Sequence, residues 1–548
     1  MTNRPLTCVV SISGIRGIVG KTIDVDQVMG LGAAYGQAIG KGGKVVVGRD
    51  SRPTGALFVQ AVSAGLRAVG CTVIDIGLVP TPTVPIMINE LKASGGIQIS
   101  ASHNPVEWNA LKLFLPTGRN VDQAGLDAVL AAYRGEASFQ TWSGIGGYRT
   151  RDDALRIHQD RVLACVDVAL IRAAKLKVVI DSVNGAGSAI APALLAALGC
   201  EVVPLFTRPD QVFPRDPEPT AANVRDTGAV VKAVGAALGF VQDPDADRLA
   251  IIDENGTYIG EEYTLVLCTA ARLAAEQAAG RKDLVVCTNL STSRMLEDVA
   301  KRHGARVLRS KVGEAHVVDA MQANHAVVGG EGNGGIIDPR VVWGRDSQIG
   351  MALVLEYLAR AKQKLSQVIA SIPRYAIHKE KVAMDRAAVT AAIAKLTGHA
   401  VTQGAELITL DGLKLVWPDR WVHLRASGTE PVSRIIAEAP TTAEASDLAA
   451  KVRTAVGAQV VDGHCTLGWW IGLGRSLVRF DPEPTSFVRL KCAPSVIPLA
   501  GVRRFTSVIS ARYSPGGSYE FWRFRRSWWS AQEARSETGR RQAAWWWP

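Results

Sequence analysis

The chain has 548 residues, of which 47% are apolar and 21% charged, values that are ordinary for a soluble globular protein and exclude disorder as its main state. Its length is sufficient for three or four domains. The formal net charge of +11 would indicate nucleic-acid binding if it were spread evenly, but +8 of it belongs to residues 465–548 alone.

Short β-branched runs alternate with Ala-rich amphipathic stretches ahead of residue 465, a pattern typical of α/β domains. The first set comprises strands 44–48, 72–77 and 96–100 and helices 56–69 and 83–91. The second set comprises strands 177–181, 201–206 and 238–242 and helices 188–198 and 228–237. The third set comprises strands 284–288, 305–309 and 326–329 and helices 294–303 and 314–321. We therefore predict three similar α/β domains with mixed or mainly parallel sheets.

The boundaries between these sets are marked by changes of pattern. Residues 134–149 break both the helical and the strand period and predict a linker, and 360–380 lead into a fourth unit. That unit holds strands 421–424 and 433–439 and a helix 442–456, which indicates a smaller α+β domain. The predicted domains are 1–150, 151–258, 259–370 and 371–464, followed by a tail at 465–548.

In each α/β set the last strand runs into a loop that is rich in Gly or polar residues. We name these the serine loop (100–105), the Asp loop (243–248) and the glycine loop (329–335). Open α/β sheets bind ligands at the carboxyl ends of their strands. The three loops therefore predict one cleft that is assembled from three domains.

The Asp loop places Asp243, Asp245 and Asp247 at alternate positions after an apolar strand. Three converging carboxylates repel one another unless a cation lies among them, and oxygen ligands suit Mg²⁺. An EF-hand is excluded because Arg248 occupies the place that requires Gly, and 249–252 continue as a strand. The alternative that remains is a solvated acidic turn.

The serine loop offers hydroxyls, the His103 imidazole and an amide. The GxSxG pattern of many serine hydrolases is absent, and the adjacent Ser102 and His103 need not face each other. A serine that carries a phosphoryl group beside the metal is one interpretation, and a polar turn with a helix cap is another.

A fourth loop, the anion loop (425–431), combines Arg425, Ser427, Gly428 and Thr429, with Arg434 just beyond it. Backbone N–H groups, hydroxyls and a guanidinium together suit a phosphate, although ordinary turns can have this composition. Segments 14–17 and 48–52 add further Arg donors. Neither segment fits GxGxxG with its strand and helix context, so a dinucleotide site has little support.

Taken in this order, the four loops closely resemble those of the α-D-phosphohexomutase family, which includes phosphoglucomutases, phosphomannomutases and phosphoglucosamine mutases. The resemblance covers 9–461. It implies three similar α/β domains and a smaller α+β domain around a central cleft.

The resemblance also implies roles for particular residues. The catalytic set is Ser102, which is phosphorylated, with Arg16, His103 and Lys112 beside it, Lys112 being the expected proton-transfer group. The Mg²⁺ ligands are Asp243, Asp245, Asp247 and a phosphoserine oxygen of Ser102. The substrate-binding set is Arg248, Glu331, Asn333, Arg425, Ser427, Gly428, Thr429 and Arg434.

The family activity is an isomerase reaction, in which a phosphoryl group moves between O6 and O1 of a hexose or hexosamine phosphate. The phosphoserine is primed by a sugar 1,6-bisphosphate, which is also the bound intermediate. Many members have Glu-x-Ser-Gly-His in the glycine loop, whereas here 331–335 read Glu-Gly-Asn-Gly-Gly, the version that looks most like phosphoglucosamine mutases. We therefore expect glucosamine 6-phosphate as substrate. The alternatives are a phosphomannomutase or phosphoglucomutase and a non-catalytic sugar-phosphate binder.

The tail holds eight of the thirteen Trp residues together with twelve Arg. Interleaved basic and aromatic residues can bind single-stranded nucleic acid, but no apolar period survives there, and we favour an irregular, disordered extension without function. No run of eighteen apolar residues occurs, the start lacks a signal-peptide-like run, and the eight cysteines form no CxxC pair. We expect a cytoplasmic enzyme whose partner is a small sugar phosphate rather than a membrane or nucleic acid.

Overall fold

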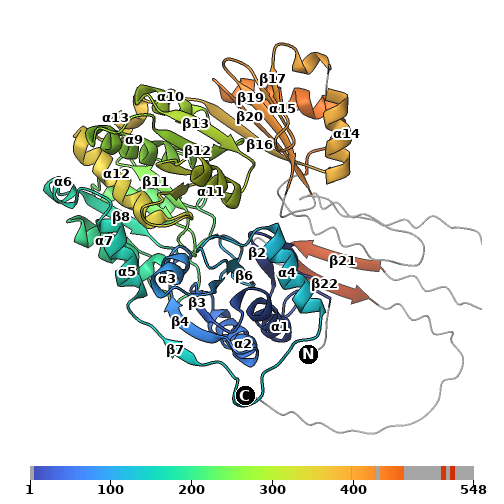
Figure 1. Cartoon of the computed structure of the whole chain (residues 1–548). Helices are drawn as coiled ribbons and strands as arrows, with labels where there is room; N and C mark the ends of the chain where they lie inside the picture. The colour runs from blue at the N-terminus through green and yellow to red at the C-terminus, as the bar shows by residue number, and fades with distance from the viewer. Residues whose placement is uncertain (1–4, 397, 428–431, 462–507, 514–518, 525–548) are drawn as a thin grey trace, which may run out of the picture. The chain divides into compact units, whose positions relative to one another are not determined.

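The computed structural model describes residues 5–396, 398–427, 432–461, 508–513 and 519–524 (Figure 1). The chain divides into two units, Met1–His464 and Cys465–Pro548. Four sheets with their helices make up the described part of the first unit, and the described part of the second is a two-stranded sheet. No helix among the described residues is both long enough and apolar enough to cross a bilayer.

The first sheet has seven strands in the order β1-β2-β6-β5-β3-β4-β7. Its strands are β1 (Val9–Ser11), β2 (Gly14–Ile18), β3 (Lys44–Arg49), β4 (Thr72–Leu78), β5 (Gly95–Ile99), β6 (Trp108–Phe114) and β7 (Tyr148–Thr150). Its helices are α1 (Val25–Tyr35), the π-helical turn η1 (Gly36–Gly40), α2 (Gly55–Ala68), α3 (Thr83–Leu91) and α4 (Gln123–Arg134).

The second and third sheets have four strands each, in the orders β11-β10-β8-β9 and β13-β12-β14-β15. The second set is α5 (Ala154–Leu163), α6 (Val168–Ala173), β8 (Lys177–Asp181), α7 (Gly187–Ala197), β9 (Glu201–Leu205), α8 (Arg225–Ala233), β10 (Leu238–Gln242) and β11 (Leu249–Asp253). The third set is α9 (Glu262–Ala278), β12 (Val285–Asn289), α10 (Met295–Arg302), β13 (Arg306–Ser310), α11 (Glu314–Ala323), β14 (Val328–Glu331), β15 (Gly335–Ile337), α12 (Ser347–Ala361) and α13 (Leu365–Ala370).

The first, second and third sheets share one strand topology. Three parallel strands are followed by an antiparallel one, in the orders β4-β3-β5-β6, β9-β8-β10-β11 and β13-β12-β14-β15. The prediction of similar α/β mixed-sheet domains is therefore confirmed. The serine, Asp and glycine loops each join the third parallel strand to the antiparallel strand, so they occupy equivalent places in the three domains.

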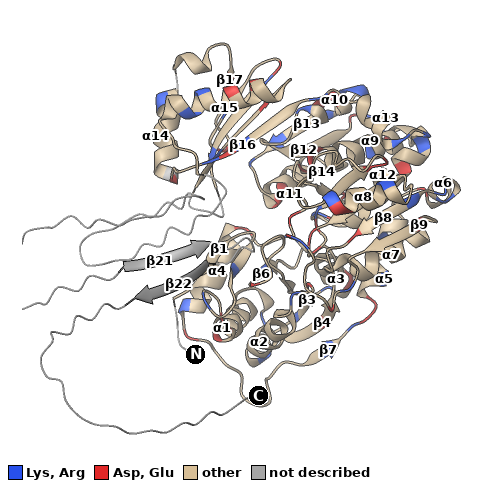
Figure 2. Cartoon of the chain, turned by 180° about the vertical axis from the view of Figure 1, so that it is seen from behind, with Lys and Arg blue, Asp and Glu red and all other residues tan. Residues whose placement is uncertain are grey.

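Burial explains why several of these strands lack charged residues. Strands β5, β10 and β12 contain no charged residue and are buried along their whole length, and the sheets are accordingly mostly tan in Figure 2. When helices cover both faces of a strand, the apolar side chains on each face are removed from water, and their burial stabilises the fold. Helix α12 contacts α9 as well as α5, α6 and α7, so the second and third domains share one continuous apolar core.

The fourth sheet is antiparallel, with the order β16-β20-β19-β18-β17. Its elements are β16 (Ala376–Val382), α14 (Arg386–Leu396), the 3-10 turn η2 (Ala400–Thr402), β17 (Glu406–Ile408), β18 (Leu413–Val416), β19 (Trp421–Ala426), β20 (Ser433–Ala439) and α15 (Thr442–Val456). Helix α15 begins with a capping box between Thr441 and Glu444, which satisfies N–H groups of its first turn. The sheets lie within the predicted domains, whose boundaries we retain as a proposal.

The second unit departs from the sequence prediction. Strands β21 (Val508–Tyr513) and β22 (Tyr519–Phe524) pair as an antiparallel hairpin, although we expected an irregular tail. Neither strand forms a continuous apolar run, because Ser510 and Arg512 interrupt β21 and Glu520 and Arg523 interrupt β22. Both strands are rich in β-branched or aromatic residues, which favour extended backbone.

Candidate active site

Ser102 lies in the loop between β5 and β6, and its backbone is left-handed, with φ of 50°. A non-glycine residue in this region is strained by about 1–2 kcal/mol, so neighbouring contacts must hold it there. The Ser102 N–H donates to Ser100 Oγ (3.0 Å), and that hydroxyl donates to Asp50 (2.6 Å). The Ser102 hydroxyl, on a side chain that is buried, donates to Asp243 Oδ2 over 2.9 Å. The serine therefore faces the Asp loop.

Arg52 holds the serine loop from the interior of the first domain. The Arg52 side chain is fully buried and forms an ion pair with Asp50 over 3.1 Å. Its guanidinium also donates, over 2.5–3.1 Å, to the backbone carbonyls of Ser102, Asn104, Pro105 and Trp108. Segment 48–52 was predicted to add Arg donors for an anion, and for Arg52 this interpretation is wrong. Its donors are committed to the protein's own carbonyls, so Arg52 is a positioning residue.

The three carboxylates of the Asp loop converge as predicted. One oxygen each from Asp243, Asp245 and Asp247 lies within 4.8 Å of the others, and all three residues are buried. Ala246 between them is left-handed, with φ of 53°, which turns the loop back on itself. One oxygen of Asp245 and one of Asp247 are buried and accept no hydrogen bond. These orphaned oxygens in an all-oxygen donor set fit a hard divalent cation such as Mg²⁺.

Lys112 of β6 supplies positive charge to this cluster. Its ammonium donates to Asp245 Oδ2 (2.5 Å) and Asp247 Oδ2 (3.1 Å). Burial disfavours the charged form, but the two carboxylates outweigh it and raise the pKa of Lys112 above its usual range. Burial likewise opposes ionisation of Asp245, and the Lys112 charge overcomes it, so the pKa of Asp245 is lowered.

Asp243 behaves differently from Asp245. Burial, followed by the repulsion of Asp245 and Asp247, raises the pKa of Asp243 well above its usual range. The cluster therefore holds more negative charge than Lys112 balances alone. A metal ion between the three side chains would remove this imbalance.

A group of basic side chains borders Ser102 on the side of the first two domains. His103 Nδ1 lies 3.5 Å from Ser102 Oγ, and the Arg248 charge, together with burial and Arg16, lowers the pKa of His103 well below its usual range. Burial and Arg248 also lower the pKa of Arg16. The Nε atoms of Arg16 and Arg248 are buried without a hydrogen-bond partner. Mutually repelling guanidinium groups with unused donors are suited to a dianionic phosphoryl group.

Arg345, just ahead of α12, is a functional candidate that was not predicted from the sequence. Its guanidinium lies 3.0 Å from Asp247, 3.1 Å from Glu314 and 3.6 Å from Glu331. Burial opposes its charge, but these three carboxylates raise the pKa of Arg345 further above its usual range. Arg345 therefore joins the Asp loop to the glycine loop. In the sequence it is one Arg before a helix, and no local pattern distinguishes it.

Thr81, ahead of α3, was also missed. Its hydroxyl donates to Asp245 Oδ2 (2.5 Å), and its N–H donates to the Asp245 carbonyl (2.9 Å). The first domain thus contacts the Asp loop through Thr81 as well as through Ser102 and Lys112.

The glycine loop presents Glu331 and Asn333. Glu331 Oε1 accepts hydrogen bonds from the Asn289 amide (2.8 Å) and the Gly313 N–H (3.0 Å), so this carboxylate is fixed in orientation. Its second oxygen is the one near Arg345. Asn333 Oδ1 accepts from the N–H of Gly335 over 3.2 Å, so the oxygen of this amide is turned back toward its own loop.

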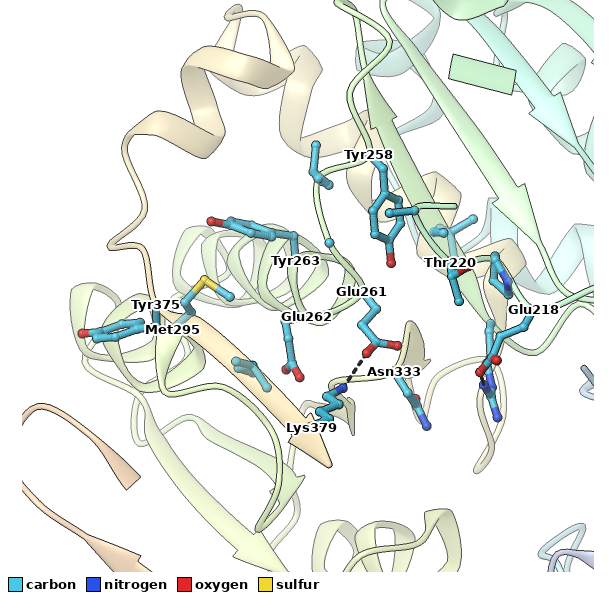
Figure 3. Close-up of a pocket in the computed structure, with 18 residues that line it drawn as sticks. Glu218, Thr220, Tyr258, Glu261, Glu262, Tyr263, Met295, Asn333, Tyr375 and Lys379 are labelled. Carbon is cyan, nitrogen blue, oxygen red and sulfur yellow. Dashed lines mark hydrogen bonds and ion pairs between the residues drawn. The ribbon is translucent and has the colours of Figure 1, made fainter. Parts of the chain in front are cut away.

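A cavity of about 530 Å³ opens beside the glycine loop (Figure 3). Asn333 and Arg248, both predicted substrate-binding residues, line it together. Lys379 of β16 forms an ion pair with Glu261 at the cavity wall (2.5 Å). Cavities of this size are typical of small-molecule sites. The structure therefore brings two predicted substrate-binding residues from different domains to one cavity.

Arg425 and Arg434 face each other on the hairpin of β19 and β20. Like charges directly opposite in an antiparallel pair repel, which leaves this place favourable to an anion. Burial lowers the pKa of Arg425, and Asp411 at 3.3 Å offsets part of that effect. Asp411 also accepts the N–H of Val312 over 3.0 Å and so ties the hairpin to the third domain.

The tip of this hairpin is only partly described. The Ser427 N–H donates to the Val432 carbonyl over 2.9 Å, which closes the turn at its base. Gly428 and Thr429 lie outside the described residues.

Four family models match the chain, all from the phosphoglucomutase/phosphomannomutase family. The alpha/beta/alpha domains I, II and III match residues 10–139, 156–256 and 261–375, and the C-terminal domain matches 379–455. A phosphoglucomutase/phosphomannomutase from Thermococcus kodakarensis is 39% identical over 442 residues, which are 79% of this chain and 95% of that protein. A phosphoglucosamine/phosphogalactosamine mutase from Sulfurisphaera tokodaii is 32% identical over 81% of this chain and 98% of its own.

Solved structures agree with these matches. A phosphoglucomutase/phosphomannomutase family protein from Burkholderia thailandensis has a TM-score of 0.70 at 28% identity, covering 83% of this chain and 98% of its own. A phosphoglucomutase from Paramecium shares the fold, with a TM-score of 0.68 at 15% identity. Fold, loops and relatives together define an isomerase that transfers phosphoryl groups. The chain belongs to the phosphoglucomutase/phosphomannomutase family, the α-D-phosphohexomutases, and it is a phosphohexomutase. The family is Mg²⁺-dependent, and the Asp triad of this chain can hold that ion.

Proposed function

We propose that this phosphohexomutase converts glucosamine 6-phosphate to glucosamine 1-phosphate by way of a phosphorylated Ser102. The observation that carries the transfer chemistry is the contact of the Ser102 hydroxyl with Asp243, beside three convergent carboxylates. A hydroxyl held in a strained, clamped loop next to a metal-binding cluster is suited to carry a phosphoryl group.

Asp243, Asp245, Asp247 and an oxygen of phosphorylated Ser102 would hold Mg²⁺. When bound, the ion would offset the negative charge that develops on the transferring phosphoryl group. Arg16, Arg248 and His103 border the same place, and the two guanidinium groups offset charge on the phosphoryl oxygens. Lys112, from the carboxylate side, is the proposed proton-transfer group.

Transfer in both directions requires the sugar to be held at its far end. Phospho-Ser102 transfers its phosphoryl group to the free hydroxyl of the sugar monophosphate, which leaves the Ser102 oxygen free and gives a bound 1,6-bisphosphate. This intermediate turns around, and its other phosphoryl group is then transferred to Ser102. Either phosphate must therefore fit the distal site, for which we propose Arg425, Ser427, Gly428, Thr429 and Arg434. Opposed guanidinium groups on a hairpin can accept a phosphate in more than one orientation, because each offers several N–H donors.

The choice of sugar rests on the glycine loop. Glu331 and Asn333 are the proposed readers of the sugar hydroxyls, and the Glu-Gly-Asn-Gly-Gly version supports an amino sugar through its likeness to phosphoglucosamine mutases. A relative named phosphoglucosamine/phosphogalactosamine mutase supports the same choice. The second candidate is a phosphoglucomutase or phosphomannomutase, which is favoured by the name of the relative that is 39% identical.

A panel of sugar phosphates tests the proposal. Glucosamine 6-phosphate, glucose 1-phosphate and mannose 1-phosphate are compared with Mg²⁺ and a trace of the matching 1,6-bisphosphate, and Ser102→Ala controls for contaminating mutases. We expect the highest kcat/KM with glucosamine 6-phosphate. A kcat/KM that is about tenfold higher for glucose or mannose phosphate, equivalent to about 1.4 kcal/mol, would favour the second candidate.

A further inference from the structure

Two segments distant in the sequence brace the Asp loop, one from the first domain and one from the third. Thr81 donates to Asp245 from the first domain, through both its hydroxyl and its N–H. From the third domain, Arg345 contacts Asp247 (3.0 Å), and the Ser347 hydroxyl donates to the carbonyl of left-handed Ala246 (2.6 Å). The positions of Asp245 and Asp247 therefore depend on the spacing between the two braces.

A buried chain of hydrogen bonds connects the braces. The Thr83 hydroxyl lies 2.9 Å from His158 Nδ1, and His158 Nε2 lies 2.9 Å from Asp346 Oδ2. All three residues are 0% exposed. An ionised carboxylate can only accept, so one tautomer satisfies the chain, with Nε2–H donating to Asp346 and Nδ1 accepting from the Thr83 hydroxyl.

The positions of these three residues in the sequence let their hydrogen bonds set the distance between the two braces. Thr83 begins α3 two residues after Thr81, and Asp346 stands between Arg345 and Ser347 as the N-cap of α12. Residues 83, 158 and 346 fall in the stretches matched by family domains I, II and III, respectively. One imidazole thus fixes the distance between the starts of two helices, and the residues at or just ahead of each start contact the Asp loop.

A hydroxyl, an imidazole and a carboxylate in line also occur in serine hydrolases. That role does not fit here, because all three side chains are fully buried and substrate cannot reach the Thr83 hydroxyl. The site of their action is the Asp loop.

We propose that Thr83, His158 and Asp346 are positioning residues that preorganise the Asp loop for its cation. The inference rests on the proposed function, since it takes Asp243, Asp245 and Asp247 as the metal ligands. If one of these hydrogen bonds is removed, Thr81 and the segment 345–347 can move independently of each other. The carboxylates must then be reordered when the ion binds, which weakens binding without removing any ligand.

The test compares Thr83→Val with Thr83→Ser in the full-length protein. Titration calorimetry with Mg²⁺ alone gives Kd, and steady-state assays give kcat and KM. We expect Thr83→Val to weaken Mg²⁺ binding about three- to tenfold, the factor that one net hydrogen bond is worth. We expect kcat to fall in parallel and KM for the sugar phosphate to stay within about twofold, because no sugar contact changes. Thr83→Ser keeps the hydroxyl and should restore the parental Kd.

A double change and a control separate positioning from a loss of stability. Adding Asp346→Asn to Thr83→Val should weaken binding less than the sum of the two single effects, because both changes cut the same chain. Thr402→Val, which removes a buried hydroxyl of the fourth domain, should leave the Mg²⁺ affinity unchanged. A parental Kd in Thr83→Val, or equal losses in Thr83→Val and Thr402→Val, would overturn the inference.

Asp245→Asn, measured beside these variants, distinguishes a failure of the positioning residues from a failure of the metal site. If Asp245→Asn loses Mg²⁺ affinity while Thr83→Val does not, only the positioning chain is wrong. If Asp245→Asn also keeps the parental Kd, the metal site of the proposed function is wrong.

Discussion

Replacing Arg52 by Lys should disable the loop that carries Ser102 while leaving the Asp triad unchanged. Arg52 is buried, pairs with Asp50, and donates to four backbone carbonyls between positions 102 and 108. Lys keeps the charge but presents three donors from a single nitrogen, in place of a planar fork of five. It cannot contact Asp50 and all four carbonyls at once, so at least two hydrogen bonds are lost.

The size of the effect follows from those lost bonds. Hydrogen bonds that involve a charged group contribute about 1.5–3 kcal/mol each, so the loss of two removes about 3–6 kcal/mol from the loop. Ser102 needs support against the strain of its left-handed backbone, because its φ is 50°. Even the lower figure corresponds to a population shift of about 100-fold, so kcat should fall by about that factor or more.

The assay is kcat at saturating sugar phosphate, together with the thermal midpoint and the Mg²⁺ affinity. Arg49→Lys is a matched control from the same segment, since Arg49 makes one hydrogen bond to the Asp50 carbonyl (3.0 Å) and is half-buried. We expect the control to stay within about twofold of the parent. If Arg52→Lys retained kcat within about threefold, instead of losing about 100-fold, the serine loop would not depend on the contacts of Arg52.

Ser102→Ala should lose nearly all turnover but still bind the sugar phosphate in equilibrium titrations, because covalent transfer needs the hydroxyl and the distal site lies on another domain. Asp245→Asn should lower kcat and shift the Mg²⁺ activation curve to higher concentration, since one of three anionic ligands becomes neutral; superimposable curves would contradict the triad. Arg425→Ala should reduce kcat/KM about tenfold or more, as a charge-assisted phosphate contact contributes about 1.5–3 kcal/mol, and an unchanged kcat/KM would move the phosphate elsewhere. A chain that ends at His464 should fold and retain activity within a few-fold, because the structure divides at that residue, and loss of its thermal transition or turnover would make the tail part of the enzyme.

Local pattern was sufficient for the elements on which the site is built. Strand β10 and helix α3 begin and end at the predicted residues, and helix α15 does so because Thr441 and Gly457 cap it at either end. The loops that follow β5, β10 and β14 were found because a buried apolar strand stops where polar residues begin. Boundaries were less certain where capping is weak, and α8 covers Arg225–Ala233 instead of 228–237.

The composition of the candidate site was only partly predictable. Asp243, Asp245 and Asp247 are close in sequence, so their convergence requires a single turn, and this could be anticipated. Arg345 and Thr81 contact the same loop although they lie 98 and 164 positions from their partners in it, and no local signal marks them. The charge of Arg52 is evident in the sequence, but the prediction assigned its guanidinium to an anion. Only the packed domain shows that backbone carbonyls surround this group.

For this protein, the sequence by itself determined the kinds of elements, the three equivalent loops and the residue types of phosphoryl transfer, because these depend on periodicity and on neighbours within a few positions. The tertiary structure decided which side chains meet. The two hydrogen bonds that link Thr83 to His158 and His158 to Asp346 span 75 and 188 positions, and they connect α3, α5 and the start of α12. Such contacts depend on how helices from different domains pack together, and the local sequence pattern around a single residue does not reveal this packing.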